Sequence, residues 1–296
     1  MDFKEQLMER VSYVEEVIEK YIPQEKGFQK KVIEAMNYSI LAGGKRLRPI
    51  FILETYRLFE GKDKEAVEPF LAAMEMIHTY SLVHDDLPAM DDDEYRRGRK
   101  TTHVVYGEAM GILAGDGLLN YAFETACQSF SSQTKLEQIA KAIQILAQKA
   151  GIYGMIGGQA VDVENCDRPL EQDRLNFIYQ LKTGALIEAS MTLGAVLAGA
   201  AEQEIIIMGK IASDIGLAFQ IQDDILDITS TTEKLGKPIN SDEKNHKTTY
   251  VTIKGIEASK KEVEMLSERA IRNLKSLKYE NSFLEQLILS LIHREK

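Results

Sequence analysis

The chain is poor in cysteine, with only two in 296 residues. Cys127 and Cys166 are too few and too far apart for a disulfide framework or a cysteine-based metal site. We therefore expect two buried or inert thiols in a reducing compartment. Proline is also scarce, with six residues, so few positions interrupt helical segments.

The chain also lacks a hydrophobic run long enough to cross a membrane. Its longest apolar run, Ala189–Ala201, is shorter than a bilayer requires and predicts a buried helix of small residues. The first residues, MDFKEQLMERV, have no apolar core of the kind found in a signal peptide. These features predict a cytoplasmic protein without membrane insertion.

Basic residues are outnumbered by acidic ones, 36 to 46, which gives a formal net charge of −10. A general nucleic-acid-binding protein needs a basic surface, so no nucleic-acid partner is expected. A small anionic substrate is still compatible with this charge, because local clusters of cations can override the global sign.

Apolar residues recur at spacings of three and four through most of the chain, for example in residues 32–41, 71–82 and 139–150. Sustained alternation of apolar and polar residues is missing. The pattern predicts an all-α fold of roughly ten or more helices. No break resembles an interdomain linker, so we expect residues 1–296 to form a single domain. The predicted loops are Pro23–Gly27, Gly61–Asp63, Leu87–Lys100, Asn165–Pro169 and Thr229–Lys247, the last being either a functional lid or an ordinary connector.

Three aspartates form the second aspartate motif, Asp223–Asp227, with the sequence DDILD. Asp223, Asp224 and Asp227 are three and four residues apart, so on a helix they share one face. Like charges placed this way repel one another, and their flanks are apolar. A carboxylate cluster on a largely buried helix needs cations to neutralise it; a solvated acidic face is the less favoured alternative.

The first aspartate motif, Asp85–Asp93, has the sequence DDLPAMDDD. Asp85 and Asp91 would diverge on an uninterrupted helix, because they are six residues apart. Pro88 disfavours helix in the residue before it, so the helix should end near Asp86 and the loop should return Asp91 to the same place. Carboxylates without cysteine or histidine partners indicate Mg²⁺, which shares protein carboxylates with substrate phosphates.

Two basic segments accompany the aspartates. Gly43–Pro49 (GGKRLRP) and Arg96–Lys100 (RRGRK) concentrate cations beside glycines. Arginine matches phosphate oxygens bidentately, and glycine lets the backbone approach an anion closely. Taken alone, each segment could be a surface salt-bridge network. Beside the aspartates, they favour Mg²⁺–diphosphate next to a second anion that binds without metal.

Six motifs stand in one order along the chain: GGKRLRP, HDDLPAMDDDEYRRG, GGQAVD, KTG, FQIQDDILD and LGKP. Together they resemble the trans-prenyltransferases of the isoprenyl diphosphate synthase family, specifically those of bacterial farnesyl diphosphate synthase type. The resemblance implies the isoprenoid synthase fold, with helices around a central catalytic cavity, and a homodimer. A later segment, KTTY, departs from many members at His246 and Val251.

The resemblance also implies a role for each matching residue. Mg²⁺, three ions per site with Mn²⁺ as a substitute, would bind to Asp85, Asp86, Asp91, Asp223, Asp224 and Asp227. The allylic diphosphate would bind to Arg96, Lys182, Thr183, Gln220, Lys237 and Lys247. Isopentenyl diphosphate would bind to Lys45, Arg48, His78 and Arg97. The residues closest to the chemistry would be Asp85, Asp91, Asp223, Arg96, Lys182 and Lys237. Gln159 and Asp162, in GGQAVD, would support the site.

The implied reaction is head-to-tail condensation of isopentenyl diphosphate with dimethylallyl and geranyl diphosphate. Tyr80 and Ser81 lie five and four residues before Asp85, where similar enzymes floor the product cavity. A bulky Tyr80 with the inserted Pro88–Ala89 indicates farnesyl diphosphate, C15. Geranylgeranyl or geranyl diphosphate synthesis, and more remotely a class I terpene cyclase, remain alternatives.

Two further alternatives are a di-iron carboxylate bundle and a non-catalytic subunit. Glu75–His78 and Glu243–His246 both fit the ExxH pattern of a di-iron site. That interpretation leaves the arginines unexplained. A non-catalytic subunit predicts damaged aspartate motifs, whereas both motifs of this chain are whole.

Overall fold

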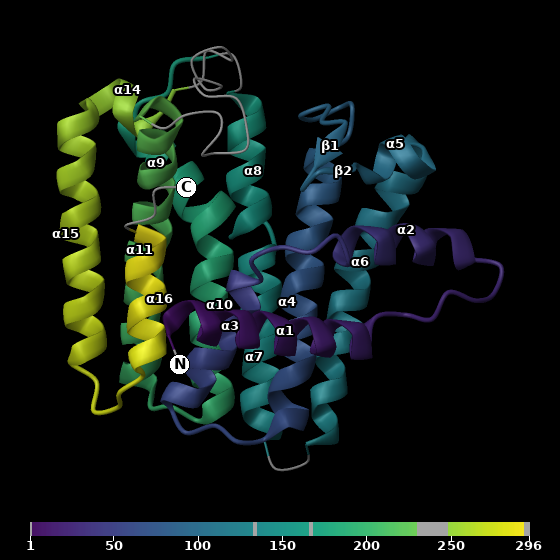
Figure 1. Cartoon of the computed structure of the whole chain (residues 1–296), viewed down its shortest axis with the longest axis horizontal. Helices are drawn as coiled ribbons and strands as arrows, with labels where there is room; N and C mark the ends of the chain where they lie inside the picture. Colours follow the sequence, from purple (N-terminus) through teal and green to yellow (C-terminus); the bar gives the residue numbers. More distant parts are fainter. Residues whose placement is uncertain (1, 133–134, 166–167, 230–247, 293–296) are drawn as a thin grey trace.

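The computed structural model describes residues 2–132, 135–165, 168–229 and 248–292. These residues are mostly helical, which confirms the predicted all-α class (Figure 1). In chain order, the elements are α1 (Phe3–Tyr21), α2 (Lys30–Ile40), α3 (Leu47–Leu58), α4 (Lys64–Asp85), β1 (Tyr95–Arg96), β2 (Arg99–Lys100), α5 (Thr102–Tyr106), α6 (Glu108–Cys127), η1 (Gln128–Ser131), α7 (Leu136–Ala150), α8 (Met155–Glu164), α9 (Gln172–Ile178), η2 (Tyr179–Gly184), α10 (Ala185–Ala198), α11 (Glu202–Thr229), α14 (Tyr250–Lys254), α15 (Ile256–Lys275) and α16 (Ser282–Ile292).

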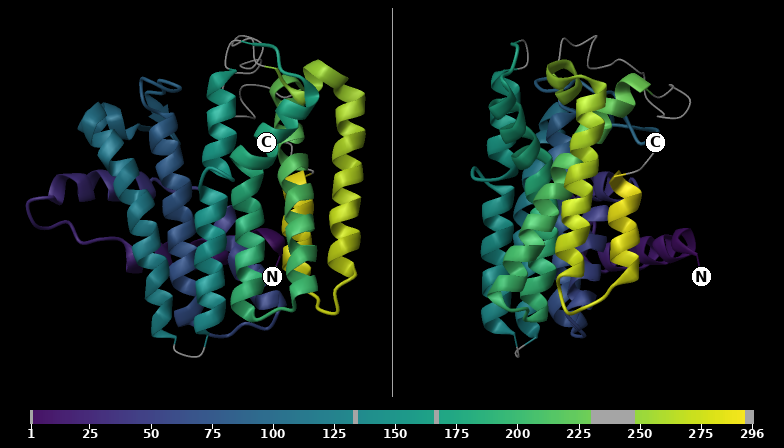
Figure 2. Two further views of the ribbon diagram at one scale, coloured as in Figure 1. Left: turned by 180° about the vertical axis from the view of Figure 1, so that it is seen from behind. Right: turned by 90° about the vertical axis from the view of Figure 1, so that its left-hand side faces the viewer.

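The long helices run side by side, and α1 and α2 lie across one face of this bundle (Figures 1 and 2). Helix α4 packs against α6 and α3, and α10 packs against α3, α7 and α11. Fully buried apolar side chains fill the space between them, among them Phe51, Phe70, Met74 and Ile77. Burying such side chains is the main favourable term in folding.

Helix α10 lies in the middle of the bundle and consists largely of small, buried residues. A Cβ on Gly194 would lie 2.5 Å from the carbonyl oxygen of Ile52, so glycine is what lets α3 approach this closely. The segment Gln172–Ala198 is long and apolar enough to span a membrane, but 72% of its apolar window is buried inside the fold. The predicted buried helix ends earlier than expected, at Ala198, because Gly199 adopts φ 85°.

Two local features depart from the sequence prediction. The predicted loop Leu87–Lys100 contains a short antiparallel hairpin that pairs Tyr95 with Lys100 and Arg96 with Arg99. At its turn, Arg97 and Gly98 have φ of 53° and 74°, as a two-residue hairpin loop requires. The second feature is η2, a π-helical turn within the predicted all-α chain. Turns of this kind are frequent at functional sites.

Candidate functional site

The first aspartate motif begins where α4 ends. Asp85 is the last residue of α4, and the backbone nitrogen of Asp91 donates to the carbonyl oxygen of Asp85 over 2.8 Å. The loop therefore returns Asp91 to the helix end, as the position of Pro88 predicts. This geometry brings the backbones of two aspartates that are six residues apart together.

The carboxylate of Asp85 is partly buried and accepts a hydrogen bond of 2.8 Å from Nε2 of Gln159 on α8. Burial raises the pKa of Asp85 to about 6; Lys182 acts in the opposite direction, and the negative charge of Asp91 adds to the rise. A carboxylate whose negative charge is disfavoured in this way gains from a bound cation.

Asp86, the next residue, is buried and pairs with Arg96 on strand β1 at 2.6 Å. Burial raises the pKa of Asp86, and the contact with Arg96 partly offsets the rise. The hairpin thus carries the second basic segment back onto the first aspartate motif, where the guanidinium of Arg96 binds a carboxylate of the protein.

The second aspartate motif lies in the last turns of α11. Asp224 is buried, and its Oδ2 accepts hydrogen bonds of 2.7 Å from the hydroxyl of Tyr179 and from the backbone nitrogen of Tyr250. Asp223 lies 3.5 Å from Nε2 of Gln220. Asp227 is buried on the same helix. Asp224 therefore anchors both η2 and α14 to α11. The positions of Tyr179 and Tyr250 in the sequence do not indicate that they bind Asp224.

Lys182 connects the two motifs. It lies in η2, and its Nζ forms an ion pair of 2.6 Å with Asp162 on α8. Helix α8 also holds Asp85 through Gln159, and η2 holds Asp224 through Tyr179. A chain of side-chain contacts therefore runs from the end of α4, through α8 and η2, to the end of α11.

The donor set of the two motifs fits Mg²⁺, because it consists of carboxylate oxygens. Within residues 2–132, 135–165, 168–229 and 248–292, no three Asp, Glu, His or Cys side chains converge closely enough to hold a metal ion. Like charges repel unless a cation lies between them. The six aspartates therefore remain candidate ligands.

A half-buried basic pair lies on the facing ends of α3 and α4. Nη1 of Arg48 lies 3.3 Å from Nε2 of His78. In the described part of the chain, no ion pair joins Arg48 to a carboxylate, and its Nε has no hydrogen-bond partner. Burial lowers the pKa of Arg48 to about 10 and, with the charge of Arg48, holds the pKa of His78 well below its usual value. A half-buried guanidinium without a carboxylate partner is suited to an anionic ligand.

Arg97 completes this basic region from the turn of the hairpin. Its Nη1 donates to the carbonyl oxygen of Gly43. A Cβ on Gly44 would lie 2.8 Å from the guanidinium carbon of Arg97, and Gly44 has φ of 143°, so glycine suits this position. The two basic segments of the sequence therefore meet in the structure.

Arg46, the middle cation of GGKRLRP, has a structural role instead. It is buried, has φ of 49°, and pairs with Glu75 at 2.7 Å. This pair neutralises Glu75, and His78 faces Arg48. Neither Glu75 nor His78, the two ligands of the ExxH sequence Glu75–His78, is therefore free to serve a di-iron site. This removes the main support for the di-iron alternative.

The remaining candidates differ in how far the structure describes them. Tyr80 is buried, and Ser81 donates to the carbonyl oxygen of His78 on its own helix. Lys45 is exposed, and Thr183 lies in η2 beside Lys182. Lys237, Lys247 and all but the first residue of the predicted lid Thr229–Lys247 lie outside the described residues.

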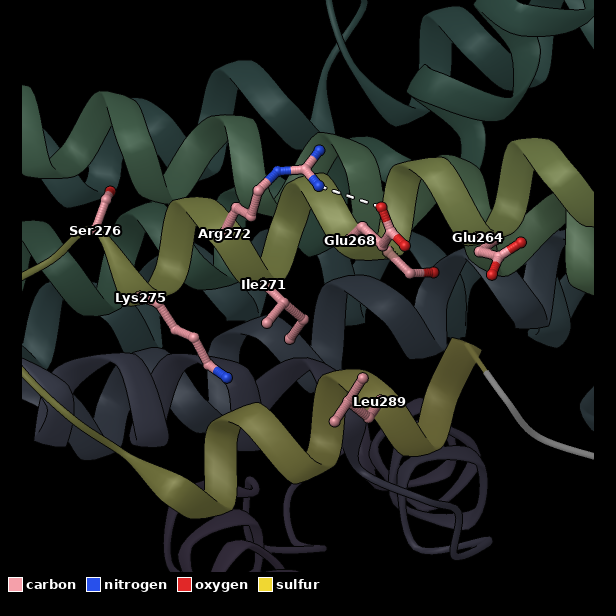
Figure 3. Close-up of a pocket in the computed structure, with 8 residues that line it drawn as sticks. Glu264, Glu268, Ile271, Arg272, Lys275, Ser276 and Leu289 are labelled. Atoms are coloured by element: carbon pink, nitrogen blue, oxygen red, sulfur yellow. Dashed lines mark hydrogen bonds and ion pairs between the residues drawn. The ribbon is translucent and has the colours of Figure 1, made fainter.

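A hollow of 630 Å³ lies away from the candidate residues, between α15 and α16 (Figure 3). Ile271 and Leu289 face each other across it, and Arg272 pairs with Glu268 along its wall at 3.2 Å. It is lined by none of the candidate residues. Size alone therefore does not identify the site of the chemistry.

Comparisons with known proteins agree with the resemblance to isoprenyl diphosphate synthases that the six motifs indicate. The family model described as polyprenyl synthetase matches residues 29–285. The chain is 43% identical over 270 residues to a farnesyl diphosphate synthase of Geobacillus stearothermophilus, a match that covers 91% of this chain and 90% of the relative. It is 47% identical over 270 residues to a geranylgeranyl diphosphate synthase of Cyanophora paradoxa, covering 89% and 87%.

Among solved structures, the chain is similar to a geranyltransferase of Helicobacter pylori complexed with magnesium and isoprenyl diphosphate. The TM-score is 0.83 at 30% identity, and the match covers 99% of this chain and 97% of that one. The resemblance drawn from the six motifs is thereby confirmed. The chain belongs to the polyprenyl synthetase family, whose members are magnesium-dependent prenyltransferases that elongate isoprenoid chains.

Proposed function

We propose that the protein condenses isopentenyl diphosphate with dimethylallyl and then geranyl diphosphate to give (E,E)-farnesyl diphosphate. The observation that carries this proposal is the contrast between two neighbouring regions. One is a linked set of carboxylates suited to metal and diphosphate. The other is a half-buried arginine–histidine pair suited to an anion that binds without metal. Two diphosphates held differently are what a condensation requires.

Mg²⁺ would be held by carboxylates of the two aspartate motifs, principally Asp85, Asp91 and Asp223, with Asp86, Asp224 and Asp227 assisting. Three ions per site, replaceable by Mn²⁺, would supply charge that stabilises the leaving diphosphate. The similar geranyltransferase of H. pylori, which is complexed with magnesium and isoprenyl diphosphate, supports this assignment.

Cationic side chains would hold the allylic diphosphate and stabilise it as it leaves. Lys182 and Arg96 each pair with a carboxylate of the protein, at 2.6 Å from Asp162 and Asp86. Exchanging those carboxylates for diphosphate oxygens, as metal occupies the aspartates, would place both cations where negative charge develops. Thr183 and Gln220, with Lys237 and Lys247, would complete this set.

Isopentenyl diphosphate would bind to Arg48, His78 and Arg97, with Lys45 at the rim. His78 is held neutral by burial beside Arg48, which lowers its pKa, so it would donate a hydrogen bond without adding charge. The allylic C–O bond breaks, and its electron pair leaves with the diphosphate. The double bond of isopentenyl diphosphate attacks the allylic carbon in a 1′–4 bond, and the departing diphosphate accepts the proton whose loss restores an alkene. Excluding water during this step is the function proposed for the Thr229–Lys247 segment.

The C15 length rests on Tyr80. Its ring is buried just over one helical turn before Asp85 and packs on His84, which contacts α6. A chain that grows along α4 from the aspartates would meet it. Both farnesyl and geranylgeranyl diphosphate synthases occur among the relatives, so the length is the finer part of the proposal.

Incubation with geranyl diphosphate and Mg²⁺, with and without isopentenyl diphosphate, tests the reaction class. A prenyltransferase forms an elongated diphosphate only when both substrates are present. Cyclised hydrocarbon from geranyl diphosphate alone would instead identify a class I terpene cyclase.

We also infer a cytoplasmic homodimer in which residues 1–296 form one domain. Apolar side chains are exposed on the neighbouring helices α5 and α6, namely Val104, Val105, Ile112 and Leu113. An apolar surface of this kind is typical of a subunit interface. Light scattering should give twice the chain mass of 33.4 kDa; a single chain mass would contradict the dimer.

A further inference from the structure

Tyr80 has no polar anchor for its ring. The side chain is 5% exposed, and its hydroxyl has no hydrogen-bond partner among the residues that the structure describes. Burial raises the pKa of Tyr80 to about 12, so the hydroxyl stays protonated at physiological pH. The orientation of the ring must therefore be fixed by packing alone.

His84, one turn further along α4, provides that packing. Its ring meets the ring of Tyr80 edge to face, with centroids 5.8 Å apart and planes at 81°. This is a favoured geometry for aromatic pairs. His84 is itself fixed, because its Nε2 donates to the carbonyl oxygen of Ile112 on α6 over 3.1 Å. The ring of His84 thus bridges Tyr80 and the neighbouring helix.

Gly115 on α6 makes room for this bridge. A Cβ at this position would lie 2.8 Å from Cε1 of His84 and closer still to Nε2. Any other residue would therefore displace the imidazole from its place between the helices. Gly115 is buried within α6 and has no positive φ, so space rather than backbone conformation explains the glycine.

We propose that Gly115 and His84 are positioning residues that set product length by holding the ring of Tyr80 across the cavity. The proposal rests on the proposed function, in which Tyr80 is the floor. Neither residue needs to touch the substrate. If His84 leaves its place, the Tyr80 ring loses the edge contact that ties it to α6. A freed ring can rotate away from a growing chain, and a further isopentenyl unit can be added.

The test is the product distribution of Gly115→Ala, measured by chromatography with isopentenyl and geranyl diphosphate in excess. Loss of one aromatic edge contact predicts that the ratio of C20 to C15 product rises about fivefold. Gly117→Ala is the matched control, since the same change on the same helix meets only the flexible thioether of Met36. It should leave the ratio unchanged.

A second pair of variants keeps the proposal testable if Gly115→Ala folds poorly. His84→Ala removes the bridging imidazole without adding a methyl group that overlaps a neighbour. It should raise the ratio of C20 to C15 product by a similar factor. In the double variant, Gly115→Ala should add nothing further, because the side chain that it displaces is gone.

Wild type and Tyr80→Ala are measured beside these variants. Longer products from Tyr80→Ala with an unchanged ratio in Gly115→Ala and His84→Ala would overturn the positioning role and leave the floor standing. A shift of either variant toward shorter products would overturn it as well. An unchanged ratio in Tyr80→Ala would instead refute the floor, and with it the positioning role of Gly115 and His84.

Discussion

Gly158 on α8 touches the backbone of Lys182 in the π-helical turn η2. A Cβ on Gly158 would overlap the backbone nitrogen of Lys182 and would lie 2.8 Å from the Cβ of Leu181. On its other side, η2 meets α11, where a Cβ on Gly216 would lie 2.9 Å from the Cα of Gly184. Two glycines on neighbouring helices thus clamp the turn that carries Lys182 and Thr183.

This clamp predicts that Gly158→Ala weakens binding of the allylic substrate. The added methyl must push η2 away from α8, which moves Lys182 relative to the aspartates. We expect the KM for geranyl diphosphate to rise about tenfold or kcat to fall by a similar factor, because misplacement by about 1 Å costs that much or more. Steady-state kinetics with each substrate varied separately measures both.

The matched control for Gly158→Ala is Gly209→Ala on α11, whose added methyl would make only ordinary contact with Thr192 at 3.5 Å. It should behave as wild type. The KM for isopentenyl diphosphate should stay unchanged in both variants. An equal rise for both substrates in Gly158→Ala would indicate general distortion and contradict the clamp.

Substitution of Arg48 should affect isopentenyl diphosphate rather than the allylic substrate. Arg48→Lys keeps the charge and loses the planar fork that binds two diphosphate oxygens. We expect the KM for isopentenyl diphosphate to rise about 10- to 100-fold, with the KM for geranyl diphosphate within about threefold of wild type, since a charge-assisted hydrogen bond contributes about 1.5–3 kcal/mol. Arg272→Lys, at an exposed pair with Glu268, should leave both values unchanged. A larger effect on the allylic substrate would contradict the assignment.

Tyr80→Ala should lengthen the product to C20 and beyond, because it removes the proposed floor. The variant should also be less stable, by about 3–5 kcal/mol if the space stays empty. Tyr80→Phe is the sharper companion, since it keeps the ring and removes a buried hydroxyl that has no partner in the described residues. It should keep C15 product and lose no stability. Chromatography of the products and urea unfolding measure the two effects; C15 from active Tyr80→Ala would place the floor elsewhere.

Asp85→Asn should stabilise the metal-free protein while abolishing activity. The folded-state pKa of Asp85, about 6, is above its ordinary value of 3.8. The stability that protonation of Asp85 contributes is therefore full below pH 3.8 and is lost as the pH rises through about 6. At about pH 8 the buried charge remains, and replacing it should raise the free energy of unfolding by about 1–2 kcal/mol after allowance for partial exposure.

Urea unfolding in EDTA at about pH 4 and about pH 8 checks this prediction for Asp85→Asn. The gain should appear at the higher pH and vanish at the lower one. Glu257→Gln, at a surface position 82% exposed, should show no gain at either pH. A destabilised Asp85→Asn at the higher pH would mean that the carboxylate has partners that favour its charge.

Much of the site could be predicted because its signals are local. The helix end at Asp85 follows from Pro88, and the shared face of DDILD follows from helical spacing. The pairing of cations could not be predicted, because it depends on which helix each cation faces. Arg46 and Arg48 look alike in GGKRLRP, yet one is neutralised by Glu75 and the other lacks a carboxylate partner in the described chain.

The two irregular backbone features were missed for related reasons. The π turn η2 adds a residue to a helical turn without changing composition, so periodicity alone does not reveal it. The hairpin needs Arg97 at positive φ, which is unusual for arginine. The close contacts at Gly115 and Gly158 lie between segments distant in the sequence, and only the fold brings them together.

The most direct test of the proposed reaction is product analysis with isopentenyl diphosphate, geranyl diphosphate and Mg²⁺. After dephosphorylation, chromatography against standards identifies the chain length, and omission of each component in turn shows what the reaction requires. We predict (E,E)-farnesol as the main product, formed only when all three components are present. A main product of C20, product without isopentenyl diphosphate, or full activity in excess EDTA would contradict the proposed function.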